Sequence, residues 1–309
     1  MRKYISGAVY VLVFLISLLP LRVLYLFSDI VFLFFLLFPF LRYRKRIVRK
    51  NLRASFPDKS EKWLRKTERQ FYHNFCDLFL AESIKTCSMS ARQMSRRLRF
   101  IGIEQVISTF ESGRSAMLYL GHQGNWEWVT SIGLHFSPCH IAAHVYHPLE
   151  NGVADDVFCR IRHHFGAVNI PMDKVLRRLL EFKAQGRQFI LGMISDQVPL
   201  WWAIHYWTDF MNQDTPVFTG AEKMARKLDT VMYYGDMTRV RRGYYQIEIR
   251  LMSDHPAELP ENELTERYFR MLENTIRRDP ASWLWSHNRW KRTREGYQEW
   301  LAKSRVRKD

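Results

Sequence analysis

From position 115 onward, short apolar runs alternate with longer amphipathic segments, and this alternation constrains the fold more than any other feature of the sequence. Six runs have the length and composition of strands: SAMLYLG, CHIAAHVY, GAVNIP, RQFILGMIS, DTVMYYGDM and YYQIEIRL. Helical stretches separate several of them, namely NWEWVTSIGLHF, GVADDVFCRIRHHF, DKVLRRLLEFKAQG and TGAEKMARKL. Strands that alternate with helices favour an α/β fold, with a mostly parallel sheet and helices on both faces.

The segments that flank this region are predicted to be helical. Between positions 60 and 99, apolar or aromatic residues recur every three to four positions, as in EKWLRKTERQFYHNFCDLFLAESIK. Ser60 follows the turn residues Pro57 and Asp58 and is placed to cap the start of this helix. From Glu261 the pattern returns to helix, and the chain ends in a basic tail. No internal repeat is visible, which argues against a repeat architecture.

Two apolar runs open the chain, at positions 5–19 and 23–41. As helices they reach roughly 22 Å and roughly 28 Å, against about 30 Å for the hydrocarbon core of a bilayer. A cleaved signal peptide fits poorly, because a second apolar run stands where a small-residue cleavage site would be expected. We therefore predict a membrane anchor over residues 1–42, which either spans the membrane or dips in and returns, and a larger domain over residues 43–309.

Basic residues flank the predicted anchor on both sides. Arg2 and Lys3 precede it. A denser cluster follows it and consists of Arg42, Arg44, Lys45, Arg46, Arg49, Lys50 and Arg53. Because positively charged flanks stay in the cytoplasm, we expect the larger domain at the cytoplasmic face of the membrane, with the cluster among anionic lipid headgroups.

The overall charge of the chain limits the classes of molecule that it is expected to bind. Lysine and arginine outnumber the acids by 47 to 31, which gives a formal net charge of +16. That sign fits nucleic acid, an anionic membrane, or an acidic protein or substrate, but the cluster beside the anchor weakens the case for nucleic acid. The four cysteines form no C-x-x-C pair, which argues against a zinc knuckle and suits a reducing compartment; they are Cys76, Cys87, Cys139 and Cys159.

The segment GHQGNWEW, at positions 121–128, follows the first predicted strand of the sheet region. His122 therefore lies at the carboxyl end of a strand, where open α/β sheets build their sites. Five positions separate His122 from Glu127, a spacing that points the two side chains apart on a regular helix or strand. They meet only if the chain turns between them; Gly124 permits such a turn, and Asn125 is suited to cap the helix that follows.

A histidine held by a carboxylate is a prepared general base, because the carboxylate fixes its tautomer and stabilises the imidazolium that forms. No serine or cysteine in this segment is placed as a nucleophile, so such a base would act on a substrate hydroxyl without a covalent intermediate on the protein. An H-x-x-x-x-E pair also arises by chance, and the structural interpretation is a polar group at a strand end and an ordinary acid in the first helical turn. The H-E-x-x-H spacing of a zinc site is missing from the sequence, and no metal is predicted.

Six blocks of the sequence, in order, resemble the late acyltransferases of lipid A biosynthesis, of the lauroyl and myristoyl type, within the wider lysophospholipid and glycerolipid acyltransferase superfamily. The blocks are RKRIVRKNLRASFPD, GHQGNWEW, YHPLENGVADDVFCRIRHHFG, GMISDQVP, FTGAEKMARKLDTVMYYG and DPASWLWSHNRWK. The resemblance runs from the predicted anchor to about Lys291. Six ordered blocks are far more specific than any one of them.

The resemblance implies an O-acyltransferase that moves a fatty acyl chain from an acyl-carrier-protein thioester to a hydroxyl of a lipid A precursor, at the cytoplasmic face of the bacterial inner membrane and without a cofactor. It implies that His122 is the general base and Glu127 its acidic partner. Arg160 or Arg162, or a backbone N–H near Gly124, would serve a phosphate or the developing oxyanion. The substrate-binding residues implied by the blocks are Gly124, Asn125, Asp196, Gln197, His287 and Arg289. The expected partners are the acyl carrier protein, an anionic lipid acceptor and the membrane, and not nucleic acid.

Two departures from the family pattern bear on the acceptor. An aromatic stretch, LWWAIHYW, follows DQVP, and Asn288 stands where the closing block of the family has an arginine. Three alternatives stay open: an acyltransferase with a glycerolipid or amino-lipid acceptor, a hydrolase in which the same base activates water, and a non-catalytic, membrane-tethered basic binding protein.

Overall fold

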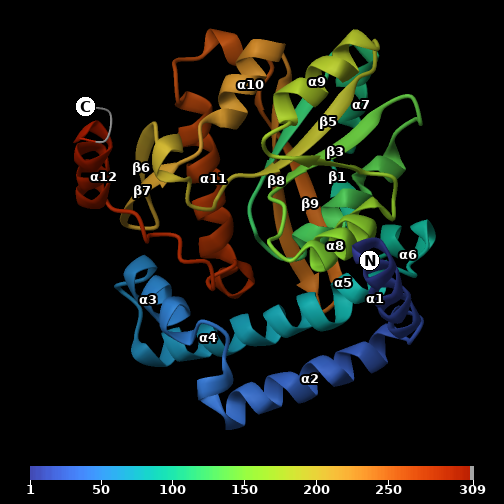
Figure 1. Cartoon of the computed structure of the whole chain (residues 1–309), viewed down its shortest axis with the longest axis vertical. Helices are drawn as coiled ribbons and strands as arrows, with labels where there is room; N and C mark the ends of the chain where they lie inside the picture. Colours follow the sequence, from blue (N-terminus) through green and yellow to red (C-terminus); the bar gives the residue numbers. More distant parts are fainter. Residues whose placement is uncertain (307–309) are drawn as a thin grey trace.

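The computed structural model describes residues 1–306 (Figure 1). The α-helices are α1 (Arg2–Ser17), α2 (Leu21–Leu37), α3 (Lys45–Ser55), α4 (Glu61–Cys76), α5 (Ser83–Thr86), α6 (Ala91–Ser95), α7 (Ile103–Glu111), α8 (Gly152–His163), α9 (Val175–Ala184), α10 (Gly220–Leu228), α11 (Glu263–Arg278) and α12 (Arg294–Val306). The π-helical turn is η2 (Asp77–Glu82), and the 3-10 helices are η1 (Pro39–Leu41), η3 (Trp126–His135), η4 (Trp201–Ala203), η5 (Pro256–Glu258) and η6 (Pro280–Ser282). The strands are β1 (Leu98–Ile101), β2 (Ala116–Leu120), β3 (Ile141–Tyr146), β4 (Val168–Pro171), β5 (Phe189–Ile194), β6 (Tyr206–Phe210), β7 (Gln213–Val217), β8 (Val231–Arg241) and β9 (Tyr244–Ser253).

Seven of the strands form one sheet, in the order β1-β9-β8-β2-β5-β3-β4. Every neighbouring pair is parallel except β8 and β9, which are antiparallel. The predicted α/β fold with a mostly parallel sheet is therefore confirmed. The carboxyl ends of β8, β2, β5, β3 and β4 meet at one edge, and in Figure 1 this edge faces α4 and α2.

The central strand β2 is buried along its whole length, and its side chains alternate between two hydrophobic clusters. Met117 and Tyr119 lie in one cluster, with residues of α9, α10 and α11. Ala116, Leu118 and Leu120 lie in the other, with residues of α7 and η3. Because successive side chains of a strand point to opposite faces, helices cover both faces of the sheet. Burial on both faces explains why the strands read as continuous apolar runs.

All six predicted strands are present, as β2, β3, β4, β5, β8 and β9. The stretch NWEWVTSIGLHF is helical as predicted, but it forms the tighter 3-10 helix η3. The sequence does not predict β1 or the hairpin of β6 and β7. In that hairpin Met211 and Asn212 both have positive φ, 54° and 61°, as a type I′ turn requires, but the usual Asn-Gly signal of such a turn is missing.

The helical segment predicted between positions 60 and 99 consists of α4, η2, α5 and α6, with β1 at its end. The Oγ of Ser60 accepts the backbone N–H of Trp63 at 3.3 Å, which confirms the predicted cap. After α4 the helix widens into η2, and π-helical turns of this kind are rare and frequent at functional sites. This turn contributes two buried acids, Asp77 and Glu82.

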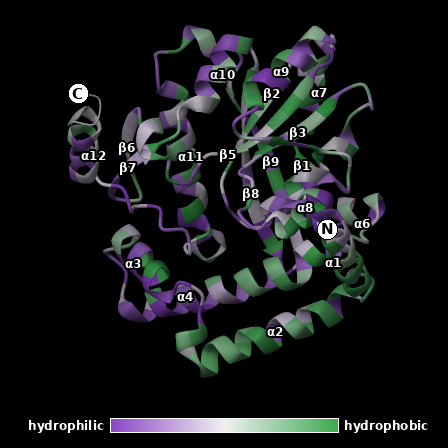
Figure 2. Cartoon of the chain, viewed as in Figure 1, coloured by the Kyte–Doolittle hydropathy of each residue, from purple (hydrophilic) through white to green (hydrophobic). Residues whose placement is uncertain are grey.

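The first two helices present a largely apolar surface (Figure 2). α2 packs against α4 and η2, while α1 packs against α8. Within residues 1–306, each helix by itself is too short or too polar to cross a bilayer; α1 and α2 meet the requirement only as a pair, which is bent by 106° at the break between them. The predicted boundary at residue 42 stays a prediction, and residues 307–309 of the predicted larger domain lie outside the described residues.

Candidate active site

His122 and Asp196 lie at equivalent positions beyond two neighbouring parallel strands. β2 ends at Leu120 and β5 ends at Ile194, and these two residues are paired in the register of the sheet. The residue two places beyond each strand is therefore brought to the same point of the carboxyl edge. This register is why two side chains 74 positions apart in the sequence meet.

The Asp196 carboxylate is buried and held by three donors. Its Oδ1 lies 2.5 Å from Nδ1 of His122, and its Oδ2 accepts the backbone N–H of His122 and the indole N–H of Trp283, both at 2.8 Å. Burial by itself would raise the pKa of this carboxyl, but the charge and hydrogen bonds of His122, together with Trp283, lower it to about 2. Asp196 is therefore an anion at neutral pH.

The contact with Asp196 fixes the tautomer of His122. An ionised carboxylate only accepts hydrogen bonds, so Nδ1 carries the proton and Nε2 keeps its lone pair. The side-chain amide of Gln197 donates to Nε2 at 3.2 Å. The imidazole also packs edge-on against Trp126, with ring centroids 5.1 Å apart. A hydroxyl that displaces Gln197 would meet a lone pair able to take its proton.

The loop after His122 turns as predicted. Gly124 has a φ of +59°, and a Cβ there would lie 2.6 Å from Sδ of Met237, so a larger residue would displace its neighbour. The Oδ1 of Asn125 accepts the N–H of Trp128 at 3.2 Å, which confirms the predicted cap of the following helix. The N–H of Gly124 already donates to the carbonyl of Ser282 at 2.9 Å.

The segment after η6 forms the neighbouring wall of the site. Gln123 and Trp283 form an antiparallel bridge, and the N–H of Leu284 donates to the carbonyl of His122 at 3.0 Å. This backbone pairing holds the indole of Trp283 against the Asp196 carboxylate.

Glu127 lies in the first turn of η3, as predicted, but it does not hold His122. Its carboxylate forms a two-point ion pair with Arg162 of α8, at 2.8 Å from Nε and 2.7 Å from Nη2. Burial would raise the pKa of Glu127, but the charge and hydrogen bonds of Arg162 lower it below its usual range. Among the described residues, the expected hydrogen bond from His122 to Glu127 is not formed, and Asp196 takes that position instead.

The two candidate arginines of α8 have different neighbours. Arg162 pairs with Glu127 and is largely buried. Arg160 is exposed and lies over the ring of Tyr10 in α1, 5.4 Å from its centroid. The structure therefore brings Arg162, and not Arg160, to the residues around His122.

His287 and Arg289 differ in how close they lie to the Asp196–Gln197 segment. The Nε2 of His287 accepts the backbone N–H of Val198 at 3.3 Å, which places His287 beside the Asp196–Gln197 segment. Arg289 is fully buried, donates to the carbonyl of Pro216 at 2.8 Å, and has a pKa lowered by burial to about 10. In the described part of the chain Arg289 has no hydrogen bond to His122 or Asp196, so it belongs to the supporting core.

Glu82 is a buried acid of the site that the sequence does not predict. Its Oε2 accepts the side-chain N–H of Asn125 at 2.7 Å and the O–H of Tyr245 at 2.9 Å, and its Oε1 accepts the O–H of Tyr25 at 2.7 Å. Burial raises its pKa. Glu82 therefore joins α2 to the loop after His122, and its place in a rare π-helical turn is the one local sign of this role.

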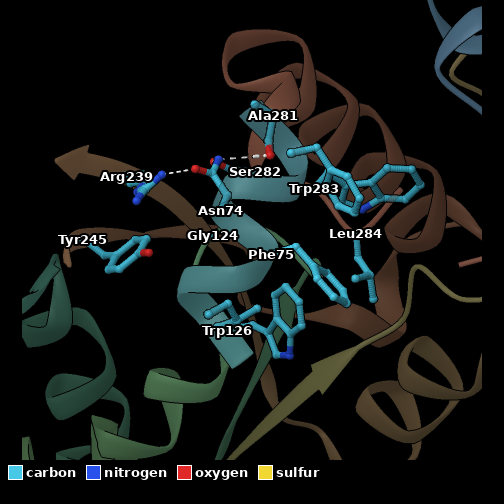
Figure 3. Close-up of a pocket in the computed structure, with 12 residues that line it drawn as sticks. Asn74, Phe75, Gly124, Trp126, Arg239, Tyr245, Ala281, Ser282, Trp283 and Leu284 are labelled. Atoms are coloured by element: carbon cyan, nitrogen blue, oxygen red, sulfur yellow. Dashed lines mark hydrogen bonds between the residues drawn. The ribbon is translucent and has the colours of Figure 1, made fainter. Parts of the chain in front are cut away.

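A narrow slot opens next to Trp126 (Figure 3). Apolar side chains from α4, η2 and the segment after η6 line it, and these are Phe71, Phe75, Leu78, Trp283 and Leu284. At one end Asn74 donates to the carbonyl of Ala281 at 3.1 Å and accepts a hydrogen bond from Arg239. The slot is therefore apolar near Trp126 and polar at its Arg239 end.

Asp29, His73 and Asp77 place potential metal-ligand atoms within 4.8 Å of one another. Arg242 donates to both carboxylates, and Arg239 donates to Asp77. Two guanidinium groups thus balance the two acids, and the cluster serves as an ion-pair network that ties α2 and η2 to the β8–β9 turn.

Two partly buried histidines lead us to expect that acid destabilises the fold. Burial lowers the pKa of both His144 and His287 to about 4, against an ordinary value of 6.5. The unfolded chain therefore binds more protons than the folded protein between pH 6.5 and pH 4, so the free energy of unfolding decreases as the pH falls through this window. We expect Tm, measured in detergent, to fall across the window, and to fall less steeply in His144→Gln.

The exposed His255 provides the matched control for this measurement. His255→Gln should leave the slope of Tm against pH unchanged, because it leaves both His144 and His287 in place. A His144→Gln variant with the slope of the wild-type protein would contradict the prediction.

The fold and the site together define a class of protein. It is an α/β protein whose buried aspartate orients a histidine at the carboxyl edge of a mostly parallel sheet, an arrangement typical of enzymes that use a general base. A family model described as bacterial lipid A biosynthesis acyltransferase matches residues 1–292. The protein therefore belongs to this family of acyltransferases, which confirms the resemblance seen in the sequence blocks. Curated proteins gave no match to the chain.

Proposed function

We propose that this acyltransferase moves a fatty acyl chain from an acyl-carrier-protein thioester to a hydroxyl group of a lipid A precursor. The observation that carries the proposal is the His122–Asp196 pair, because a 2.5 Å contact at Nδ1 leaves Nε2 as a base at the carboxyl edge of the sheet. Membership of the lipid A biosynthesis acyltransferase family supports the choice of acceptor.

In the proposed reaction, the acceptor hydroxyl takes the place of the Gln197 amide beside Nε2 of His122. As the hydroxyl oxygen attacks the thioester carbonyl, Nε2 accepts its proton, and Asp196 stabilises the imidazolium. The tetrahedral intermediate then expels the thiolate, which takes the proton from His122. One ester forms, one thioester breaks, and the enzyme returns to its starting protonation state.

The negative charge that develops on the thioester carbonyl needs hydrogen-bond donors. We assign this role to Arg162, because its guanidinium is held at two points by Glu127, which lies five positions beyond His122. The N–H of Gly124, which the sequence suggested as an alternative donor, is used by the carbonyl of Ser282.

We further propose that the protein sits at the cytoplasmic face of the bacterial inner membrane. A helix pair bent by 106° suits an anchor that dips in and returns. The apolar side chains of this region that are at least half exposed are Met1, Tyr4, Val11, Leu12, Leu15, Leu18, Leu26, Phe27, Leu33, Phe34, Leu37, Phe40 and Leu41. The basic helix α3 follows them, where it would meet anionic headgroups. The acidic acyl carrier protein carries a charge opposite in sign to the net charge of +16 on this chain, so the two proteins attract each other.

The test is to incubate the full-length protein with acyl-carrier-protein thioesters of several chain lengths and to weigh the lipid products by mass spectrometry. Lipid A precursors, glycerolipids and amino-lipids serve as acceptors in separate reactions. A lipid A precursor heavier by one acyl group, with release of the carrier thiol, is expected. Acylation of another lipid class, or free fatty acid as the main product, would refute the proposed acceptor; an intact thioester would refute the enzymatic role.

A further inference from the structure

A wider groove lies beside the slot, between α4, the β8–β9 turn and the end of α11. It has a volume of about 790 Å³, and its lining contains a single acid, Asp279. The cationic side chains that line it are Lys66, Arg69, Arg239, Arg241, Arg242 and Arg278. The proposed chemistry at His122 uses none of them, so the groove needs an explanation of its own.

The acids behind this groove are already paired. Asp77 accepts hydrogen bonds from both Arg239 and Arg242, and Asp236 accepts from Arg278. Three cations of the groove have no acidic partner. Within the described residues, the side chains that form neither a hydrogen bond nor an ion pair are those of Lys66, Arg69 and Arg241. Arg241 lies over the ring of Tyr244, 3.8 Å from its centroid, a contact that leaves its positive charge in place. The groove therefore carries an excess of positive charge that the protein itself does not neutralise.

Arg239 adds a buried donor that lacks an acceptor. Its terminal nitrogens bond to Asn74 and Asp77, which hold the guanidinium in place, while its Nε is buried and has no partner. A buried donor left unpaired costs free energy, which a ligand oxygen would recover. The side chain of Arg239 lines both the groove and the slot, so a small shift of this side chain would bring the unpaired donor to a ligand in the groove.

A concave site with several cations fits a phosphate group, whose oxygens accept several charge-assisted hydrogen bonds at once. One wall of the groove is apolar: Phe32 of α2 lines it, and the same helix exposes apolar side chains to the surroundings, among them Leu33 and Phe34, which are 52% and 51% exposed. That wall favours a phosphate carried by a lipid over a free anion. We propose that this groove binds the phosphate of an anionic lipid, and that this lipid is the acceptor of acyl transfer.

The position of the groove relative to the base supports the second part of the proposal. The groove and the slot share Asn74, Arg239, Ala281 and Ser282. At the other end of the slot lies Trp126 (Figure 3), whose ring packs on that of His122. A lipid held by its phosphate at Arg239 therefore lies beside a slot whose far end is Trp126, the neighbour of the base. The role of this lipid as acceptor rests on the proposed function, whereas the phosphate site itself does not.

The test measures lipid binding in the absence of an acyl donor. The full-length protein, in neutral dodecyl maltoside micelles, is titrated by calorimetry with dilauroyl phosphatidic acid, dilauroyl phosphatidylcholine and inorganic phosphate. We expect saturable binding of phosphatidic acid. It should weaken at least about tenfold, or about 1.4 kcal/mol, in a groove variant that combines Lys66→Gln, Arg69→Gln and Arg241→Gln.

The matched control removes the same number of charges from α9 and α10, at the opposite end of the molecule from α4 (Figure 1). It combines Lys183→Gln, Lys223→Gln and Lys227→Gln, all at exposed positions. Its affinity should stay within about twofold of the wild-type value, because distant exposed charges contribute little. An equal loss in both variants, or no loss in the groove variant, overturns the proposal. Inorganic phosphate bound as tightly as phosphatidic acid assigns the groove to a free anion and also overturns it.

Acyl-transfer kinetics separate this proposal from the proposed function. The groove variant should raise KM for a phosphorylated acceptor at least about fivefold, with kcat within about twofold, because the phosphate is bound equally before and during reaction. If the groove variant loses lipid binding but the wild-type protein transfers no acyl chain, the phosphate site stands and the proposed function fails. If acyl transfer occurs and KM is unchanged in the variant, the lipid in the groove is not the acceptor.

Discussion

Replacing His122 with alanine is expected to lower kcat for acyl transfer by about 10²-fold to 10⁴-fold, the usual contribution of a positioned general base. The imidazole of His122 is the group whose Nε2 lone pair meets the acceptor hydroxyl, so the loss should fall on kcat rather than on KM. The fold should survive, because the buried Asp196 carboxylate still accepts hydrogen bonds from the indole N–H of Trp283 and from the backbone N–H of residue 122. The measurement is single-turnover transfer from an acyl-carrier-protein thioester, with Tm recorded in parallel.

Added imidazole gives this prediction a second readout. The deleted side chain leaves space beside Trp126 and Asp196, and a free imidazole that binds there should restore part of the lost rate. The matched control is His147→Ala, since His147 is exposed and bonds only to the carbonyl of Pro148 in the described structure. Full activity in His122→Ala would remove His122 from the mechanism, and an equal loss in His147→Ala would show that the effect is not specific to the site.

The sheet could be predicted from the sequence because its strands are buried on both faces. A run such as AMLYL of β2, with every residue buried, is typical of a central strand that is covered on both faces. The same logic places His122 just beyond a strand end, where an open α/β sheet forms its site. Asp196 is predicted only through the family resemblance, and as a substrate-binding residue. The turn at Gly124 and the caps at Ser60 and Asn125 were also predictable, because each depends on residues within a few positions of it.

The partners within the site could not be predicted, because they depend on strand order. Asp196 reaches His122 only because β5 is the neighbour of β2 in the sheet. The order of the strands in the sheet cannot be read from the order of the residues in the sequence. Glu127 is five positions from His122 and looked like its partner, yet Arg162 of α8 binds it. Glu82 lies in a segment that reads as an ordinary amphipathic helix, and its contacts with Tyr25 and Asn125 arise only from tertiary packing.

Replacing Asp196 with asparagine should lower kcat by about 10³-fold to 10⁴-fold, by analogy with the loss when the aspartate of a serine-protease triad is changed to asparagine. An asparagine can present its amide N–H to Nδ1 of His122, which would move the proton to Nε2 and remove the base. The side chain keeps its shape, so Tm should change far less than kcat. The measurement is again single-turnover transfer, at several pH values, with Tm as the check on folding.

Glu127→Gln provides the decisive comparison, because the structure assigns Glu127 to a different partner. Removing this charge leaves Arg162 buried and unpaired, which should cost about 3–5 kcal/mol of stability and lower Tm. A second change, Arg162→Gln, should then restore much of Tm, because it removes the unpaired charge as well. If instead Glu127→Gln lowers kcat as far as His122→Ala with Tm unchanged, and Asp196→Asn keeps most of its activity, then Glu127 is the acidic partner of the base and the His122–Asp196 pair is structural.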